Sequence, residues 1–302
     1  MTSHTLPAEA LQPRVAALYC YPVKGLGAVS LLHSVVGIEG LEWDRRWMVV
    51  DSAGRFVTQR QLPAMAAIQV SLERYQLCLK APDGRRCYVP LTPPQGERVE
   101  TRVHGAPCHG IDEGDEVAAW LESVCREHWR HGLRLLRFAH DSIHDETLLR
   151  HVGEQRFANL GYPERKATTG FADGYPLLVT SRASLTAVNQ ALAAKGEQGV
   201  EMSRFRPNVV LQGVPAFAEH DIDTLGFNEG ALALWACKPC ERCPVTRVDQ
   251  SSGEVVHASE PLEVLKQIGR FPGTAIFGVN AIVLAGHGQR LTVGASAAIR
   301  WC

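Results

Sequence analysis

The chain has 302 residues, of which 45% are hydrophobic and 21% are charged, as in a globular protein with a sizeable core. Its 31 basic and 32 acidic side chains leave a net charge of −1, which offers no general attraction to nucleic acid. No apolar run approaches the roughly eighteen residues of a membrane helix. Residues 1–13 also lack the basic start and apolar block of a secretory signal. We therefore expect a cytoplasmic protein that binds neither nucleic acid nor membrane.

The first 110 residues contain short strand-like runs separated by turn-forming residues such as Ser52-Ala53-Gly54 and Pro82-Asp83-Gly84. Seven short strands at this spacing favour an antiparallel sheet or barrel over βαβ units. The predicted strands are 16–21, 30–36, 47–51, 56–59, 67–72, 76–79 and 99–103.

An amphipathic helix follows these strands, with Asp115 as its expected N-cap. Its apolar residues recur at i, i+3, i+4 and i+7, and they are Val117, Trp120, Leu121 and Val124. The next stretch, 139–169, is polar and weakly patterned, so it is predicted to connect a domain at 14–138 to a domain at 170–302. Its histidines are expected to be solvated rather than metal ligands, and they are His140, His144 and His151.

In the second half, a strand at 175–180 is predicted to run into a helix capped by Ser181, and another helix at 260–268 begins after Ser259 and ends at Gly269. Further predicted strands are 209–212, 231–237, 245–248, 274–284 and 291–293. The pattern predicts an α+β fold that is mostly β, with a few helices.

The nine cysteines form an odd number without the spacing of a disulfide framework, which favours reduced thiols. Five lie among apolar neighbours and are predicted core residues, and they are Cys20, Cys78, Cys87, Cys108 and Cys125. Three others, Cys237, Cys240 and Cys243, form a C-x2-C-x2-C cluster followed by Pro244.

This cluster is short of ligands for a closed metal site. An iron–sulfur cluster needs a fourth nearby cysteine, and zinc needs a second ligand pair. Molybdenum held by a pterin dithiolene needs only one soft protein thiolate. Arg242 beside Cys243 and Arg247 four residues on favour a thiolate at that sulfur. The spacing alone also allows plain structural cysteines.

Several motifs, in order, make the chain resemble the MOSC-domain family, named for the C-terminal domain of molybdenum cofactor sulfurase. They are Tyr21-Pro22-Val23-Lys24-Gly25, Gly40-Leu41-Glu42-Trp43-Asp44-Arg45-Arg46-Trp47, Thr58-Gln59-Arg60-Gln61, Asp173-Gly174-Tyr175-Pro176, Thr180-Ser181, Arg204-Phe205-Arg206-Pro207-Asn208 and Cys240-Glu241-Arg242-Cys243. The closest resemblance is to the branch of the mitochondrial amidoxime-reducing component and its bacterial relatives. It implies an N-terminal β-barrel-like MOSC-associated domain and a C-terminal MOSC β-barrel with a few flanking helices.

The resemblance also implies a molybdenum cofactor (molybdenum–molybdopterin) and roles for individual residues. Cys243 would be the molybdenum ligand and the catalytic residue. Lys24 and Arg45 would hold the anionic end of the pterin, with Gly25 supplying backbone where many relatives have serine. The rest of the pterin and phosphate cradle would be Thr180, Ser181, Arg206 and Asn208.

These residue types suit a phosphate-bearing ligand on physical grounds. Arginines grip oxygens bidentately, a lysine adds a point charge, and Ser181 stands at a helix N-terminus. Plainer interpretations remain: Lys24 as a surface turn, Arg206 as a partner of carbonyls and Cys240 as a packing residue. Asp173 would either cap a turn or lie near the substrate.

The predicted activity is molybdenum-dependent reduction of small N-hydroxylated compounds, by oxygen-atom transfer to the metal. The chain reaches Cys302 without a plant-type C-x4-C-x2-C segment, so a separate ferredoxin or flavoprotein reductase is expected to supply electrons. Neither pyridoxal phosphate nor an iron–sulfur cluster is expected. One alternative is a carrier of the cofactor or of persulfide sulfur, and another is a structural or iron–sulfur protein using all three clustered cysteines.

Overall fold

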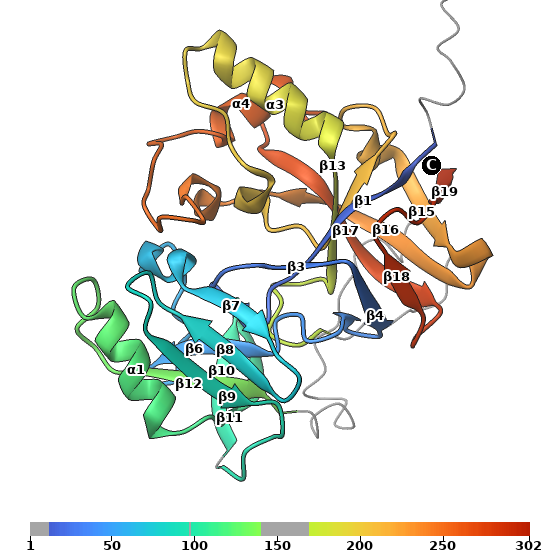
Figure 1. Ribbon diagram of the computed structural model, residues 1–302. Coiled ribbons are helices and arrows are strands. Elements are labelled where there is room, and N and C mark those ends of the chain that lie inside the picture. Colours follow the sequence, from blue (N-terminus) through green and yellow to red (C-terminus); the bar gives the residue numbers. More distant parts are fainter. Residues whose placement is uncertain (1–11, 97, 140–168) are drawn as a thin grey trace, which may run out of the picture.

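The computed structural model describes residues 12–96, 98–139 and 169–302. Figure 1 shows two lobes: one at the lower left that contains β6 to β12 and α1, and one at the upper right that contains β13 to β19, α3 and α4. The predicted mostly β fold with a few helices is confirmed. None of the helices in the described ranges has the length and apolar character needed to cross a bilayer.

The C-terminal lobe is built on an eight-stranded sheet in the order β19-β15-β16-β17-β13-β14-β1-β3. Its strands are β1 (Arg14–Cys20), β3 (Val29–Leu31), β13 (Leu177–Ser181), β14 (Val209–Gln212), β15 (Ile222–Phe227), β16 (Leu232–Glu241), β17 (Ile276–Ala285) and β19 (Ala298–Trp301). Two helices, α3 (Arg182–Ala194) and α4 (Leu262–Ile268), contact each other and pack against this sheet. Apolar residues that alternate along the strands form a core on one face of this sheet, and the helices cover apolar residues such as Val210 and Phe277 on the other face.

The N-terminal lobe contains a five-stranded sheet in the order β10-β11-β12-β6-β2 and a three-stranded sheet, β7-β8-β9. The strands are β2 (Val23–Lys24), β6 (Trp47–Asp51), β7 (Gln69–Leu72), β8 (Gln76–Lys80), β9 (Arg86–Pro90), β10 (Arg98–Val103), β11 (Ala106–Asp112) and β12 (Leu133–Phe138). Helix α1 (Asp115–Cys125) packs on β12 and β9. The fully buried Trp47 lies in the core that these elements share.

Three early strands, β1, β3 and β4 (His33–Gly37), belong to the C-terminal lobe, although β2 between them belongs to the N-terminal lobe. Strand β1 pairs with β14, and β4 pairs with both β5 (Gly40–Leu41) and β18 (Arg290–Thr292). The predicted connection at 139–169 lies almost wholly outside the described residues. Local sequence patterns cannot reveal that β1 joins a sheet built about 190 residues later, because that pairing is entirely non-local. The chain therefore crosses between the lobes near β2, where residues of the candidate site lie.

Most predicted elements agree with the structure. The strands predicted at 47–51 and 209–212 have the observed bounds, and Ser181 caps α3 by accepting a hydrogen bond from the backbone N–H of Ser184 at 3.1 Å. All five cysteines predicted for the core are buried. Gly269 ends α4 as predicted.

Other predictions were wrong. Residues 56–59 form no strand, and only Phe56 makes an isolated bridge to β6. Residues 245–248 were predicted as a strand, but Pro244 instead begins a 3₁₀ turn, Pro244–Arg247. Proline suits the start of such a turn because its φ is preset and it lacks an N–H. Helix α1 begins at Asp115, so its N-cap is Gly114, and α4 begins two residues later than predicted. The segment with His140, His144 and His151 lies outside the described residues.

His220 gives a prediction about acid stability. Its side chain is 6% exposed, lies edge-on to the Phe271 ring, and has no hydrogen-bond partner at either ring nitrogen within the described residues. Burial lowers the pKa of His220 to about 4. In the unfolded chain this histidine takes up a proton near pH 6.5, whereas in the folded protein it stays neutral down to about pH 4. The free energy of unfolding is therefore unaffected by His220 above pH 6.5 and falls as the pH drops from 6.5 toward 4. We expect this fall to be at most about 3 kcal/mol, measured by urea unfolding. His220→Phe should flatten this slope, whereas His287→Asn, at an exposed turn, should leave it unchanged.

Candidate functional site

A cavity of about 410 Å³ lies between the lobes, within the size range of small-molecule and cofactor sites. Its lining has six basic side chains, which are Lys24, Arg45, Arg60, Arg206, Lys238 and Arg242. It has two carboxylates, Asp173 and Glu241. This excess of positive charge favours an anionic ligand.

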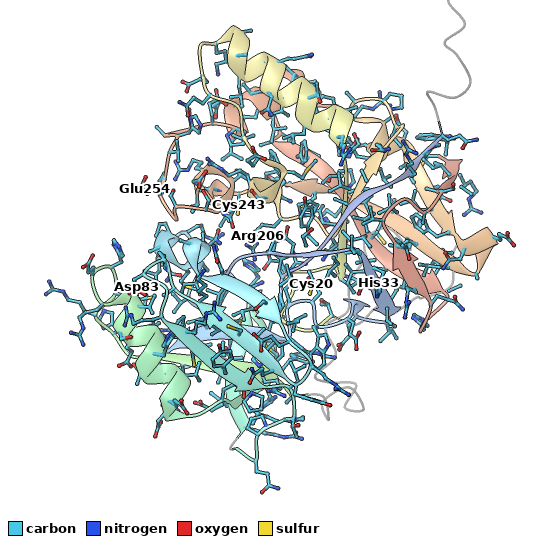
Figure 2. The ribbon with its side chains drawn as sticks, in the orientation of Figure 1. Cys20, His33, Asp83, Arg206, Cys243 and Glu254 are labelled. Carbon is cyan, nitrogen blue, oxygen red and sulfur yellow. The ribbon has the colours of Figure 1, made fainter. Side chains whose placement is uncertain are left out.

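Cys243 lies at one side of this cavity, after the end of β16. Its backbone is extended, and its carbonyl accepts hydrogen bonds from the N–H and the hydroxyl of Thr246, at 3.1 and 3.0 Å, which close the 3₁₀ turn. The side chain is exposed. Arg60 Nη1 of the N-terminal lobe lies 3.5 Å from Cys243 Sγ. Figure 2 shows Cys243 and Arg206 where the two lobes face each other.

The three clustered cysteines differ in burial and in hydrogen-bond partner. Cys237 is buried and its Sγ lies 3.3 Å from the carbonyl oxygen of Trp235, whereas Cys240 Sγ accepts a hydrogen bond from Arg242 Nη1 at 2.8 Å. In the described part of the chain, no group of three or more His, Cys, Asp or Glu side chains could hold a metal ion. Arg242 therefore bonds Cys240, and the cation beside Cys243 is Arg60. The contact between Arg60 and Cys243 joins residues that are far apart in the sequence.

Arg45 and Arg206 lie on the Tyr21 ring, with their Cζ atoms 4.4 and 4.3 Å from its centroid. Arg45 pairs with Asp44, and its Nη1 donates to Asn208 Oδ1 at 3.0 Å. Burial lowers the pKa of Arg206 to about 10, so it stays charged at neutral pH. Burial also opposes the charge of Arg45, but Asp44 outweighs it and raises the pKa of Arg45. Of these two adjacent guanidinium groups, only that of Arg45 pairs with a carboxylate, and Arg206 donates to the Leu26 carbonyl and to Gln250 instead.

Lys24 is 7% exposed and forms an ion pair with Asp173, so it is not the surface turn that its sequence neighbours allowed. The side chain of Asp173 also lies 2.9 Å from His104 Nε2. The Asp173 side chain is 69% exposed, and although desolvation inside the cavity would raise the pKa of its carboxyl, Lys24 and His104 together hold that pKa well below its usual range. Asp173 therefore lies in the site rather than only capping a turn. Gly25, next to Lys24, has φ +89°, a conformation that L residues rarely adopt.

Thr180 and Ser181 are the two predicted binding residues that do not line the cavity. Both are fully buried. Thr180 Oγ1 lies 3.4 Å from Met202 Sδ, and Ser181 caps α3. Gly174 and Tyr175 line the cavity in this part of the chain. The remaining predicted residues, Lys24, Gly25, Arg45, Arg206, Asn208 and Cys243, do line it together.

An amide pair joins the lobes beside the cavity. Gln59 and Gln250 exchange two hydrogen bonds, of 3.1 and 3.0 Å. Gln59 Nε2 also donates to the Gly25 carbonyl at 2.7 Å, while Gln250 Oε1 accepts from Arg206 Nη1 at 3.0 Å. Sequence reasoning assigned no role to either glutamine. This network couples the backbone of Gly25 to the side chain of Arg206.

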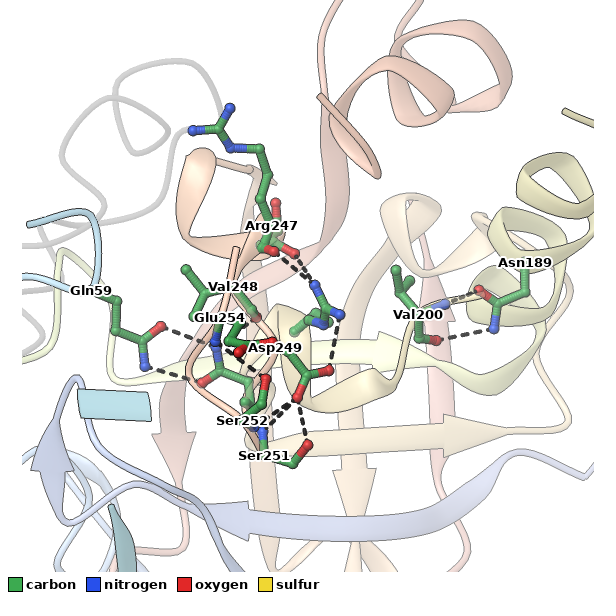
Figure 3. A network of polar contacts seen from close by, with 12 residues as sticks. Gln59, Asn189, Val200, Arg247, Val248, Asp249, Ser251, Ser252 and Glu254 are labelled. Atoms are coloured by element: carbon green, nitrogen blue, oxygen red, sulfur yellow. Dashed lines mark hydrogen bonds and ion pairs between the residues drawn. The ribbon is translucent and has the colours of Figure 1, made fainter. Parts of the chain in front are cut away.

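The loop after Cys243 is held from beneath by Arg204. This buried side chain donates to the carbonyl of Arg247 at 2.9 Å and to Asp249 Oδ2 at 3.0 Å. Asp249 Oδ1 in turn accepts from the backbone N–H groups of Ser251 and Ser252, both at 2.9 Å (Figure 3). The buried Arg204 guanidinium thus holds both ends of the segment 247–249 that leads to Gln250.

Residues 12–128 match the MOSC N-terminal beta barrel domain, and residues 166–297 match the MOSC domain. The fold and the site thus define a MOSC protein with both domains. The chain is 32% identical to mitochondrial amidoxime-reducing component 1 of Xenopus laevis, over 257 residues that span 83% of this chain and 70% of that protein. The Homo sapiens protein of the same name is also 32% identical, over 83% of this chain and 71% of its own length. A molybdenum cofactor sulfurase of Bos taurus is 26% identical, over 80% of this chain but 27% of the sulfurase.

The chain therefore belongs to the MOSC-domain family that contains the mitochondrial amidoxime-reducing components.

Proposed function

We propose that this protein is a molybdenum-cofactor-dependent reductase of N-hydroxylated compounds. The observation that carries the proposal is an exposed Cys243 thiol in the same positively charged cavity as Lys24, Arg45 and Arg206. A thiolate and a set of cations are what a metal–pterin with a phosphate needs from a protein. The names of its relatives, amidoxime-reducing component and molybdenum cofactor sulfurase, point to the same chemistry.

Each residue has a separate task in this proposal. Cys243 provides the one protein sulfur for the metal. Arg45 and Arg206, held in place by the Tyr21 ring and by Asn208, bind the anionic end, and Lys24 adds charge. Arg60 places a positive charge beside this sulfur, with its Nη1 3.5 Å from Cys243 Sγ. Thr180 and Ser181 leave this set because they are buried outside the cavity.

When bound, the molybdenum supplies the two-electron chemistry that removes the substrate oxygen. The protein chain contributes orientation, charge and access: the open side of the cavity at Cys243 admits a small N-hydroxylated molecule. Electrons come from a separate ferredoxin or flavoprotein reductase. A reducing cytoplasm is the matching location, since all nine cysteines are free thiols.

The test is to purify the chain from cells that make the cofactor and to measure bound metals and benzamidoxime reduction with a reduced viologen dye. We expect near-stoichiometric molybdenum and formation of benzamidine. Iron with a visible charge-transfer band would overturn the proposal in favour of a cluster.

A second candidate is a carrier of the cofactor or of persulfide sulfur, and the exposure of Cys243 favours it because a carried sulfur must reach another protein. Stoichiometric molybdenum without reduction of benzamidoxime or of a simple hydroxylamine would support this carrier. A persulfide on Cys243, detected by mass spectrometry of the intact protein, would support it further.

A further inference from the structure

His104 occupies an unexpected position in a tight turn. It connects β10 to β11 together with Gly105, and the two residues have φ values of +47° and +82°. Positive φ at both central positions of a two-residue hairpin is the type I′ turn, where Asn, Asp and Gly are the favoured residues. Histidine is found at positive φ more often than most side chains, but it is not among the residues that this turn favours. The turn alone therefore does not require a histidine here.

The reason lies in the cavity that His104 faces. Its Nε2 atom lies 2.9 Å from Asp173 Oδ1, so the hairpin of the N-terminal lobe contacts the C-terminal lobe at this point. Lys24 as well as His104 holds Asp173 ionised, and together they outweigh the desolvation of a carboxylate inside the cavity, which would raise its pKa. An ionised carboxylate at one ring nitrogen fixes the orientation and the tautomer of an imidazole.

His104 also has access to water. Its side chain is 47% exposed, and it lines both the cavity and an adjoining hollow of about 460 Å³. The two spaces share His104 and Phe56. Among the described residues that line the cavity, His104 is the one histidine, the side-chain type that exchanges protons most readily near neutral pH.

We propose that His104, oriented by Asp173, is the general acid that protonates the N–O group of the substrate. This inference rests on the proposed function. The reduction of a substituted hydroxylamine consumes two electrons and two protons and yields the corresponding amine and water, as the N–O bond breaks. The external electron-transfer protein supplies the electrons. His104 gives one proton from Nδ1, while Nε2–H stays bonded to Asp173, and water supplies the second proton and reprotonates the ring.

Charged groups of both signs surround the His104 ring. Asp173 pairs with Lys24 as well as with His104, and Arg102 donates to the Gly105 carbonyl at 3.5 Å. Arg55 and Glu100 line the adjoining hollow and carry opposite charges. The ring thus has a carboxylate at Nε2 and is open to water and to the cavity, which is the placement that a proton donor needs.

The decisive variant is His104→Asn, because asparagine suits a type I′ turn and should preserve the hairpin. With a reduced viologen dye as donor, we expect kcat to fall by roughly 10²–10⁴-fold, the usual contribution of general acid–base catalysis. The molybdenum content and the Tm should remain those of the wild type. The decline of kcat at alkaline pH in the wild type should be absent in the variant. His287→Asn, at an exposed turn between Gly286 and Gly288, is the matched control.

A second measurement tests the orienting role of Asp173 without measuring turnover. Long-range 1H–15N spectra of the full chain should show neutral His104 in the Nε2–H tautomer, and Asp173→Asn should shift it to a mixture. If the wild type is active and His104→Asn keeps kcat within twofold and the same pH profile, this inference is overturned while the proposed function stands. A molybdenum-loaded wild type that reduces no N-hydroxylated compound would overturn both. If the His104 tautomer did not change in Asp173→Asn, the orienting role of Asp173 would be wrong.

Discussion

Replacing Cys243 by serine is expected to remove the molybdenum and, with it, the reductase activity. A serine hydroxyl is a hard, protonated oxygen at neutral pH, and it cannot replace a soft thiolate as a metal ligand. The substitution should cost little stability, because Cys243 is exposed and the contacts that hold its turn come from its backbone. The measurement is the molar ratio of molybdenum to protein, together with the rate of benzamidoxime reduction. We expect at least a tenfold loss of metal, and a Tm equal to that of wild-type protein purified without the cofactor.

Cys240→Ser is the matched control, three residues earlier in the chain. Cys240 Sγ accepts a hydrogen bond from Arg242, a role that a serine oxygen can also fill. Molybdenum and activity should therefore remain within about twofold of the wild type. Equal losses of metal in the two variants would contradict a lone-thiolate site. Full retention of molybdenum in Cys243→Ser would show that Cys243 is not the ligand.

The sequence predicted the parts of the fold that depend on local chemistry. Ser181 as a cap, Gly269 as a stop and the buried run at 47–51 each follow from one residue or one short pattern. The strand at 245–248 failed because Pro244 and the Thr246 hydroxyl stabilise a turn that apolar content alone does not reveal. The pairing of β1 with β14 has no local signature.

The candidate site divides in the same way. Motif order brought Lys24, Arg45, Arg206, Asn208 and Cys243 into one set, and the structure places them around one cavity. The order of motifs could not reveal which cation lies beside Cys243, because Arg60 reaches that sulfur only when the two lobes pack together. Ser181 shows the opposite case: it caps α3 as predicted, but its own side chain is buried and does not line the cavity. Residue type indicates what a side chain can do, and tertiary packing decides what it faces.

Arg204→Met is expected to destabilise the protein and to weaken cofactor retention, although Arg204 does not line the cavity. Methionine fills a similar apolar volume but leaves the carbonyl of Arg247 and the carboxylate of Asp249 without their donor. We expect the free energy of unfolding to fall by on the order of 2–3 kcal/mol, measured with urea, since Asp249 retains some access to water. The loop that carries Gln250 should loosen, and Arg206 then loses one of its acceptors.

Arg182→Met is the matched control for this effect. Arg182 also bonds an amide side chain and a backbone carbonyl, those of Gln212 and Ala16, but it does so at the exposed start of α3. Its replacement should change stability by less than about 0.5 kcal/mol and leave molybdenum unaffected. If Arg204→Met lost stability but kept full molybdenum at a temperature where it is folded, the loop would not position Arg206. Loss of metal in the folded variant would instead show that the buried Arg204 guanidinium, by holding this loop, supports cofactor binding in the cavity.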